Sequence, residues 1–347
     1  MSDVTETREL PPWLAAQRTA LLGQRGHAWL LQGPSGLGQY SLALELVRAW
    51  LCDHFDGVDG VDGAAGARGA CGHCGSCHAI DVRAHADLCV LMPETAMMEL
   101  GWPLSEKAQS DIDDKKRKPS KEIRVEAMRD AVEFSQRTSA RGRGKAVLVY
   151  PAERMNHVTA NALLKTLEEP PGDVKFVLAS GAAHQLLPTI RSRCMGHHMA
   201  WPAAADALAW LHAQDVPAAD AAVLLAAAGG RPDDALRLAQ GGQTARSWSL
   251  VPKSVARGDG TVFADWGMAQ VVDALQKLCH DLLVVHSGAV PRFFAGADLP
   301  PAASMPALTR WSKELAGHAR VVEHPFNSGL MLETLVSRAQ TALNSKR

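Results

Sequence analysis

The chain has 347 residues, of which 47% are hydrophobic and 21% charged, and its formal net charge is −1. This length exceeds what one ordinary hydrophobic core holds, so we expect two or three domains. A net charge near zero excludes nucleic-acid binding driven by the field of the whole molecule, which leaves only a local patch for such contacts.

The start of the chain, MSDVTETRELPPWLAAQ, has no basic segment followed by an apolar one, so we expect no signal peptide. No run of about 18 apolar residues occurs, so we expect no membrane span and no membrane partner. The sequence therefore predicts a globular, cytoplasmic chain.

Short apolar runs separated by helical patterns dominate the first two hundred residues. The runs predict buried strands, and they read HAWLLQG (27–33), ADLCVLMP (86–93), GKAVLVY (144–150) and VKFVLAS (174–180). Helical spacing occupies 40–52, 121–137 and 158–169, and the prolines at 170 and 171 end the last helix. We expect that helix to turn four apolar side chains inward, namely Ala162, Leu163, Leu164 and Leu167. Alternating strands and helices predict an α/β fold with a parallel sheet.

Other segments lack such a pattern. Residues 53–70 are rich in Gly, Asp and Ala and predict a loop, and residues 93–120 are polar and predict irregular structure. The run KKRK at 115–118 could touch DNA phosphates, but the acidic residues before it favour a solvated loop. After about residue 200 the pattern predicts only helices.

The segment LLQGPSGLGQYSLALELV has the glycines of a phosphate-binding loop, Gly33, Gly36 and Gly38, between a predicted strand and a predicted helix. A working loop then needs a lysine for the phosphates and a small hydroxyl for magnesium, but Gln39 and Tyr40 stand there. A lost charge pair costs about 4 kcal/mol at an effective dielectric of about 20, or roughly three decades in affinity. The segment is a plain tight turn, a functional nucleotide site or a relic of one. We favour the relic and expect no bound ATP.

A second part of the ATPase chemistry is also missing. Active enzymes of this kind place an Asp-Glu pair at the end of an apolar strand, where it holds magnesium and polarises the attacking water. Here the strand AVLVY runs into Pro151 and Ala152, and Glu153 follows two positions late. Because the two losses are independent, the sequence predicts a chain that does not hydrolyse ATP.

The stretch CGHCGSC places Cys71, Cys74 and Cys77 within seven residues, where three thiolates can surround one metal ion. Clustered cysteines in a chain of this size indicate metal ligation in preference to disulfides. Zinc is the metal we expect, in a structural role. An iron–sulfur cluster uses the same spacing, but the Cys-Pro that usually follows is absent. Unligated thiols are the remaining alternative.

A tetrahedral zinc site needs a fourth ligand. Cys52, at the end of the helix that follows the glycine loop, is the best candidate, and His73, His78 and Cys89 are alternatives. Cys89 lies within the apolar stretch DLCVL and therefore suits the core better.

Three motifs occur together in this chain: the loop GPSGLG, NALLKTLEEPP at 161–171 and TIRSRC at 189–194. With them the chain resembles the clamp-loader branch of the AAA+ ATPases, in bacteria the gamma/tau and delta-prime subunits of DNA polymerase III. Both kinds of subunit share the cysteine pattern, with a cysteine at the position of Cys52. The altered glycine loop and the missing Asp-Glu pair favour the delta-prime kind. The resemblance is specific over about residues 10–200.

The resemblance implies a fold of three parts. Residues 1–200 form an AAA+ (RecA-like) core with a zinc module at about 52–80, residues 201–243 a small helical lid, and residues 244–347 a helical collar for oligomerisation. On the lid, active relatives carry a phosphate-sensing arginine where this chain has Asp233. We expect Asp233 to be the N-cap of a helix, preceded by Pro232.

The resemblance also implies a function. The chain is expected to be a non-hydrolysing stator in a five-membered ring with gamma/tau and delta subunits, part of the DNA-directed DNA polymerase III holoenzyme. That ring opens the sliding clamp and places it on primer-template DNA. The cofactor implied is a structural zinc. Two alternatives remain open: an active gamma/tau-like ATPase, and a stand-alone zinc-dependent DNA-binding protein.

One site residue is implied by the Ser-Arg-Cys motif, here Ser192, Arg193 and Cys194. In the family this arginine reaches across the subunit interface to the ATP of a neighbour, as an arginine finger that stabilises charge on the transferring phosphoryl group. A surface salt bridge is the plainer alternative for Arg193. Arg191, two residues away, is a candidate for a supporting role.

Overall fold

The computed structural model describes residues 10–54, 69–301, 303–322, 324 and 327–345. The chain divides into two compact units, Met1–Trp201 and Pro202–Arg347, which are described separately below. The predicted loop at 53–70 falls almost entirely outside the described residues, as does the middle of the predicted zinc module.

The first unit is built on a five-stranded parallel sheet with the order β2-β3-β4-β1-β5. Its strands are β1 (Ala28–Gln32), β2 (Leu88–Leu91), β3 (Lys145–Val149), β4 (Val174–Ser180) and β5 (Met195–His198). The parallel sheet and four of its strands confirm the sequence prediction. The central strands β3 and β4 are almost wholly buried, as continuous apolar runs require.

The fifth strand was not predicted. β5 reads Met-Gly-His-His, is largely exposed and, within the described part of the chain, pairs only with β1 at the edge of the sheet. An edge strand needs no apolar face on both sides, so its sequence carries little signal.

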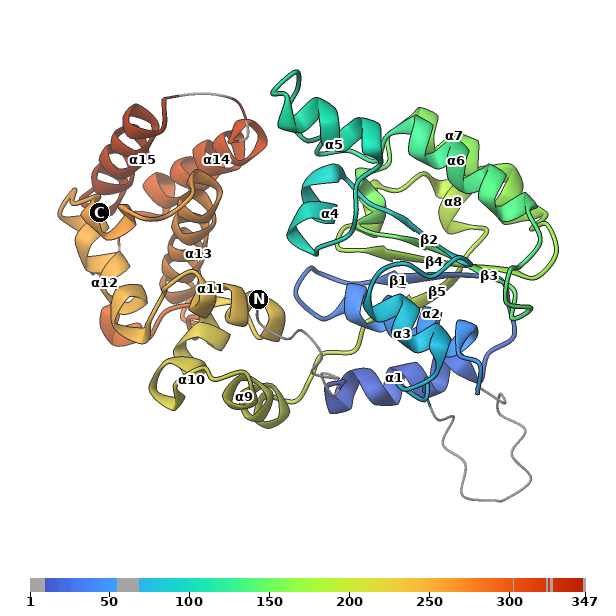
Figure 1. Ribbon diagram of the computed structural model, residues 1–347. Helices are drawn as coiled ribbons and strands as arrows, with labels where there is room; N and C mark the ends of the chain where they lie inside the picture. Colours follow the sequence, from blue (N-terminus) through green and yellow to red (C-terminus); the bar gives the residue numbers. More distant parts are fainter. Residues whose placement is uncertain (1–9, 55–68, 302, 323, 325–326, 346–347) are drawn as a thin grey trace. The chain divides into compact units, whose positions relative to one another are not determined.

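Helices cover both faces of the sheet. The helices of this unit are α1 (Pro12–Leu22), α2 (Gln39–Leu51), α3 (Gly75–Asp81), α4 (Glu94–Glu99), α5 (Glu106–Asp113), α6 (Val125–Gln136), α7 (His157–Glu168) and α8 (Pro188–Arg191). Figure 1 shows α1, α2 and α3 on one side of the sheet and α6, α7 and α8 on the other. On the second side, Met128 of α6 and Leu163 and Leu167 of α7 pack on Val147 and Phe176 of the sheet.

Two details of this unit differ from expectation. The polar stretch 93–120 is not wholly irregular, because it contains α4 and α5, and the Ser105 hydroxyl caps α5 by accepting from the Ala108 N–H. The inner face of α7 is also rotated from the predicted one. Leu163 and Leu167 are buried, but Ala162 and Leu164 are only half-buried, and Ala160 takes their place inside.

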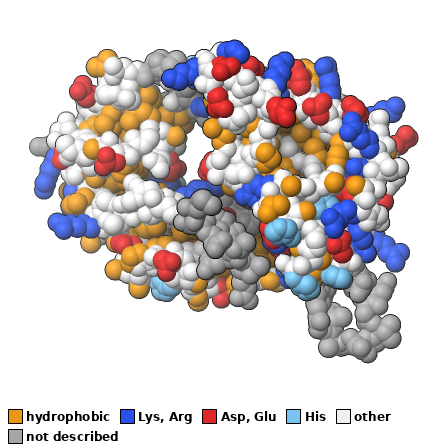
Figure 2. Space-filling view, viewed as in Figure 1, with side chains coloured by type: hydrophobic (Ala, Val, Ile, Leu, Met, Phe, Trp, Pro, Cys, Tyr) orange, Lys and Arg blue, Asp and Glu red, His pale blue; other side chains and the backbone are white. Residues whose placement is uncertain are grey.

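Two residues of the charged run at 115–118 pair with nearby acids. Lys116 Nζ lies 2.8 Å from Asp114, and Arg117 makes a 2.5 Å ion pair with the Glu94 carboxylate. Over the face drawn in Figure 2, Lys and Arg side chains are interspersed with Asp and Glu. This pairing supports the solvated-loop interpretation of the run.

The described residues of the second unit form helices joined by turns, with no strand among them. Its helices are α9 (Ala204–Ala213), α10 (Ala218–Ala227), α11 (Pro232–Gln240), α12 (Ala245–Ala256), α13 (Met268–His286), α14 (Met305–Val321) and α15 (Ser328–Leu343). One hydrophobic cluster joins α9 to α11, and a larger one joins α12 to α15 around Trp248 and Trp311. The division into a lid at 201–243 and a collar at 244–347 stays a prediction. Among the described helices, none combines the length and apolar character needed to cross a bilayer.

Candidate functional site

The glycine loop lies between the end of β1 and the start of α2, where a phosphate loop belongs. Gly36 and Gly38 have positive φ angles of 83° and 88°, which favour glycine. A Cβ on Gly38 would lie 2.6 Å from Leu14 Cδ1, and one on Gly33 would lie 3.0 Å from Met199 Cβ. Backbone conformation and close packing therefore favour glycine at these positions, in addition to the pattern of the phosphate loop.

Gln39 closes the loop from within. Its side-chain amide donates to the Gly33 carbonyl at 3.0 Å and to the Pro34 carbonyl at 2.6 Å, and the residue is only 4% exposed. A lysine in a working loop directs its charge toward bound phosphate. Here the side chain is neutral and its donors are already used by the loop.

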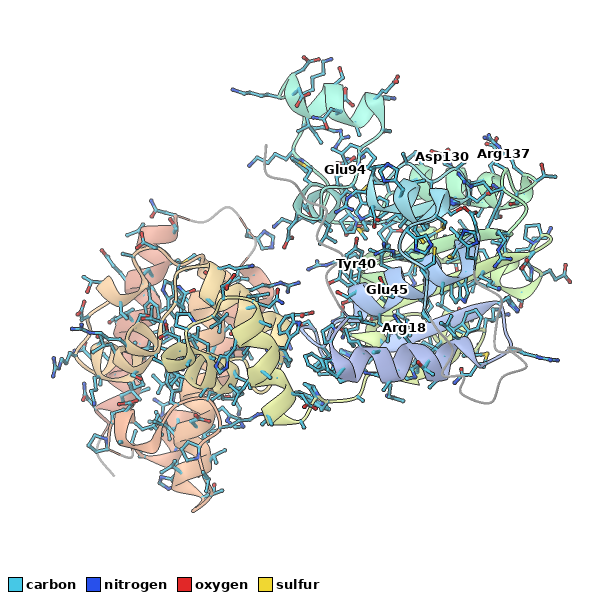
Figure 3. All side chains as sticks on the ribbon, turned by 60° about the horizontal axis from the view of Figure 1, so that its bottom comes forward. Arg18, Tyr40, Glu45, Glu94, Asp130 and Arg137 are labelled. Carbon is cyan, nitrogen blue, oxygen red and sulfur yellow. The ribbon has the colours of Figure 1, made fainter. Side chains whose placement is uncertain are left out.

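Tyr40 lies where a working loop has its magnesium-binding hydroxyl, and it is held by two other aromatic residues. Its ring packs on the ring of Tyr150, at the end of β3, with 5.3 Å between centroids. Its phenolic oxygen accepts a hydrogen bond of 2.7 Å from the Trp102 indole N–H. Figure 3 shows Tyr40 at the start of α2. Burial raises the pKa of Tyr40, so the phenol stays neutral.

The end of β3 carries no acidic pair toward the loop. Pro151 and Ala152 follow Tyr150. The next residue, Glu153, is hydrogen-bonded to the end of β4. Its carboxylate accepts from the Ser180 hydroxyl at 2.7 Å and from the Gly181 N–H at 3.1 Å. A Cβ on Gly181 would lie 3.2 Å from Glu153 Oε1 and 3.5 Å from Ser35 N, so the carboxylate borders the loop. An anion there disfavours phosphate.

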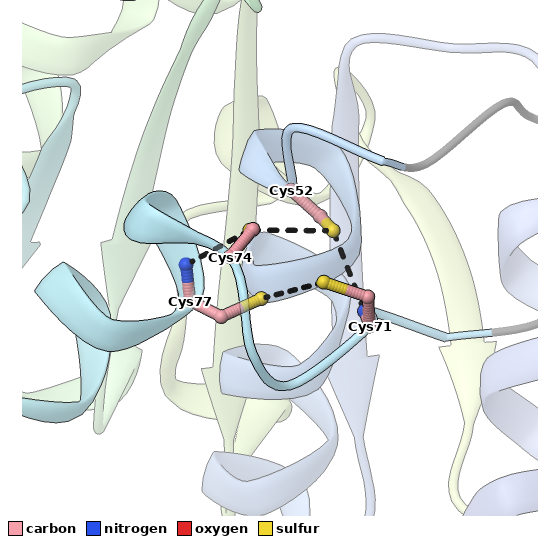
Figure 4. A group of neighbouring side chains, drawn as sticks. All are labelled: Cys52, Cys71, Cys74 and Cys77. Carbon is pink, nitrogen blue, oxygen red and sulfur yellow. Dashed lines mark hydrogen bonds between the residues drawn. The ribbon is translucent and has the colours of Figure 1, made fainter.

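Four cysteines come together beside the end of α2 (Figure 4). The sulfur atoms of Cys52, Cys71, Cys74 and Cys77 all lie within 4.8 Å of one another. The Cys52–Cys74 and Cys71–Cys77 sulfur separations are 3.8 and 4.0 Å. A tetrahedral zinc with Zn–S bonds of about 2.3 Å requires sulfurs about 3.8 Å apart, so this group could hold the ion.

The backbone around these cysteines favours thiolates. The Cys71 N–H points to the Cys52 sulfur and the Cys77 N–H to the Cys74 sulfur, each at 3.4 Å. The N–H of His73 lowers the pKa of Cys71 to about 6, whereas burial raises the pKa of Cys52 and of Cys77. Buried thiols beside an anionic one need a cation to ionise together, which is what a bound metal supplies.

The alternative fourth ligands lie outside this group. His73 has its Nδ1 2.8 Å from the Cys71 carbonyl, and neither it nor His78 joins the sulfur cluster. Cys89 packs against the core of the sheet, and burial raises its pKa to about 12.

Arg193 lies just after α8 and is bound within its own chain. Its Nε and Nη2 atoms donate to the Glu168 carboxylate, the first at 2.8 Å, and its Nη1 donates to the Thr189 carbonyl at 2.8 Å. Ser192 is exposed and also bonds to the Thr189 carbonyl, while Cys194 packs partly into the core and Arg191 is exposed. The surface salt bridge is therefore present, and the role across an interface stays a prediction.

The prediction for Asp233 is wrong. The N-cap of α11 is Arg231, Pro232 is the first helical residue, and Asp233 follows in the first turn. Proline favours that first position because it has no N–H to leave unbonded, which places the cap at Arg231, two residues before the predicted one. In the first turn a carboxylate still interacts favourably with the helix dipole.

Sequence reasoning missed Trp102 and the side-chain hydrogen bonds of Gln39. Trp102 is 62 positions from its partner Tyr40 in a stretch with no repeat or motif. The only signal was local: Tyr40 stands where a working phosphate loop has its magnesium-binding hydroxyl, and Tyr150 directly precedes the positions of the missing Asp-Glu pair.

These features define the class. A parallel α/β unit with an altered phosphate loop and a four-cysteine group, followed by a helical unit, has the architecture of an AAA+ clamp-loader protein. A family model described as DNA polymerase III, delta subunit, matches residues 15–202. This match spans more than half of the chain, and the chain belongs to that family.

Two sequence relatives are named as subunits of DNA polymerase III. The chain is 38% identical over 234 residues to DNA polymerase III subunit delta' of Pseudomonas aeruginosa and 33% identical over 238 residues to that of Escherichia coli K12. Each match covers 66% of this chain and 61% of the relative's length. A Thermotoga maritima structure described as a DNA polymerase III gamma subunit-related protein is 17% identical, with a TM-score of 0.45, covering 95% of this chain and 100% of that one.

Proposed function

We propose that this chain is a non-hydrolysing, delta-prime-type subunit of a bacterial clamp loader. It assembles in the cytoplasm with gamma/tau and delta subunits into a five-membered ring that places the sliding clamp on primer-template DNA. The observation that carries the proposal is the closed glycine loop. Gln39 bonds to the loop carbonyls, and the Tyr40–Tyr150 pair fills the region where magnesium would be held.

Within this proposal Arg193 acts on a neighbouring subunit. Its present partner, Glu168, is 49% exposed at the side chain, and an exposed ion pair is worth about 0–1 kcal/mol. Exchanging that carboxylate for a nucleotide phosphate across an interface therefore costs little. Hydrolysis then depends on ring assembly, because the cation is delivered only when the neighbour is in place.

The test is reconstitution with gamma/tau and delta, comparing the wild type with Arg193→Ala in clamp-stimulated ATP turnover. A trans arginine is worth about 10³-fold at the site it serves, so that one site should become inactive while the ring still assembles. Arg129→Ala, on the exposed face of α6, is the matched control. Unchanged turnover by Arg193→Ala would remove the trans role.

The active-ATPase alternative is separated by a simpler measurement. Magnesium-dependent, micromolar ATP binding by the isolated chain would favour an enzyme over a stator. With Gln39 and Tyr40 as they stand, we expect no binding in that range.

We further propose that the four-cysteine group holds one structural zinc. Metal analysis of the full chain should find one zinc per chain. Cys52→Ser should lose it and Cys89→Ser should retain it, because only Cys52 lies in the sulfur cluster. Equal zinc contents in both variants would contradict the ligand set.

A further inference from the structure

The cysteine group and the closed glycine loop are connected through α2. The helix begins with Gln39 and Tyr40, and Cys52 follows directly after its last residue. Asp53, the next residue, accepts hydrogen bonds from the Ser76 hydroxyl at 2.6 Å and the Ser76 N–H at 3.2 Å. Cys52, in the four-cysteine group, and the bonds between Asp53 and Ser76 therefore hold the C-terminal end of α2, the helix that begins with Gln39 and Tyr40.

A second connection runs from α3 toward the glycine loop through Arg83, which lies two residues after α3. Arg83 has a positive φ of 59°, which is uncommon for a residue with a side chain. Its guanidinium donates to the Leu100 carbonyl at 2.5 and 3.1 Å and to the Gly101 carbonyl at 2.8 Å. It also lies 5.0 Å from the centre of the Trp102 ring. These contacts fix the segment that follows α4.

Trp102 completes the connection to the loop. It is 7% exposed, and its indole N–H donates to Tyr40, whose ring packs on Tyr150. A buried indole N–H is costly to leave without a partner, so this bond fixes the Tyr40 ring in place. The path therefore runs from α3 through Arg83 and Trp102 to the first turn of α2.

We propose that Arg83 and Trp102 couple the metal-loaded cysteine group to the glycine loop, so that the metal site keeps the loop closed. Metal binding fixes α3 and the residue after α2 in one arrangement. The loop then has its single closed form without a nucleotide. This inference rests on the proposed function only in taking the cysteine group to hold zinc.

Hydrogen exchange of the full chain tests the coupling. Zinc-loaded and chelator-treated protein are compared at residues 33–44, with β4 as an internal reference. We expect zinc removal to speed exchange at 33–44 by about fivefold, the effect of losing one ordinary hydrogen bond, while β4 stays protected. In Trp102→Phe, which keeps a ring but lacks the N–H, the loaded protein should already exchange faster, and zinc removal should add less.

Controls and a second readout make the result specific. Trp201→Phe changes an exposed tryptophan and should behave as the wild type. The chain has only two tyrosines, so ultraviolet titration of the phenols reports the Tyr40–Tyr150 pair directly. We expect zinc removal to lower the apparent pKa of one of them.

Two results would overturn the proposal. In the first, zinc removal speeds hydrogen exchange at residues 70–83 but leaves residues 33–44 as protected as before. If zinc removal also unfolds β4, exchange is instead compared among zinc-loaded variants. Arg83→Met is compared with its control Arg129→Met, and Trp102→Phe with its control Trp201→Phe. The second result that would overturn the proposal is unchanged exchange at residues 33–44 in both Arg83→Met and Trp102→Phe. Neither ATP nor a partner subunit enters these measurements, so failure of the clamp-loader proposal would be seen separately.

Discussion

At the scale of single residues, Gln39 shows how a small chemical change alters a binding loop. A lysine here would carry a charge that the loop cannot satisfy alone, so it would stay available for phosphate. The glutamine amide has two N–H groups, and both are matched by carbonyls of its own loop. Nucleotide binding would have to break these bonds without gaining an ion pair in return.

We predict that Gln39→Lys alone does not restore ATP binding, because Tyr40 still fills the magnesium position beside Tyr150. The double variant Gln39→Lys, Tyr40→Thr should bind magnesium-ATP more tightly than the wild type by up to roughly three decades, the value of the restored charge pair. Calorimetric titration measures both. Micromolar binding by the single variant would show that the aromatic pair is no obstacle.

Asp87 is a second residue whose role is decided locally. It is fully buried, and it accepts from the Ser139 hydroxyl and from the N–H groups of Ala140 and Arg141, with Lys145 Nζ at 3.4 Å. Burial alone would raise its pKa, but these donors and the lysine outweigh burial and hold the pKa of Asp87 below its ordinary value.

Because its pKa is lowered by folding, Asp87 stabilises the protein above its unfolded-state pKa, near 4, and loses that contribution as pH falls through the folded value. We predict that Asp87→Asn lowers the free energy of unfolding by about 3 kcal/mol at pH 7, with a smaller difference below pH 4. Urea titrations between pH 7 and 3 check this. Asp130→Asn, at an exposed position on α6, should change little at any pH.

At the scale of elements, α1 and α2 pack closely at the glycine loop. The contact depends on Gly38, which precedes α2 and faces Leu14 of α1. Gly38 therefore sets both the turn into α2 and its distance from α1.

We predict that Gly38→Ala lowers the free energy of unfolding by about 2–3 kcal/mol, because it combines a left-handed backbone with a Cβ 2.6 Å from Leu14 Cδ1. Gly242→Ala is the matched control. It has a similar φ of 81°, but its Cβ would meet nothing within 4 Å, so only the backbone cost of about 1 kcal/mol applies. Equal losses in urea unfolding would show that the Leu14 contact relaxes freely.

Elements also show what the sequence could predict. β3 and β4 were predicted because both are short apolar runs rich in valine with glycine or proline nearby, which favours a buried strand over a buried helix. β5, α4 and α5 were missed because the first is a polar edge strand and the other two are short helices in a polar stretch. The fourth cysteine was identified by its position at the end of the helix after the glycine loop and by the family resemblance. The Arg83–Trp102–Tyr40 contacts join distant positions and need the folded chain.

At the scale of the whole molecule, charge decides how the chain meets DNA. The formal net charge is −1, and the basic run at 115–118 has acidic partners, as in the pair between Arg117 and Glu94. Contact with primer-template DNA through phosphates requires several unpaired cations on one surface. A ring can gather such cations from several subunits, whereas the near-zero net charge of this chain gives no long-range attraction for DNA.

We therefore predict that the isolated chain binds primer-template DNA more weakly than about 10⁻⁴ M at physiological salt, at the weak end of non-specific binding. The assembly with gamma/tau and delta should bind much more tightly, with an affinity that falls steeply as salt rises. Fluorescence anisotropy with labelled DNA at several salt concentrations measures both. Tight, strongly salt-dependent binding by the isolated, zinc-loaded chain would instead favour a stand-alone DNA-binding protein. If that DNA binding were lost on zinc removal, the DNA contact would be assigned to the four-cysteine group.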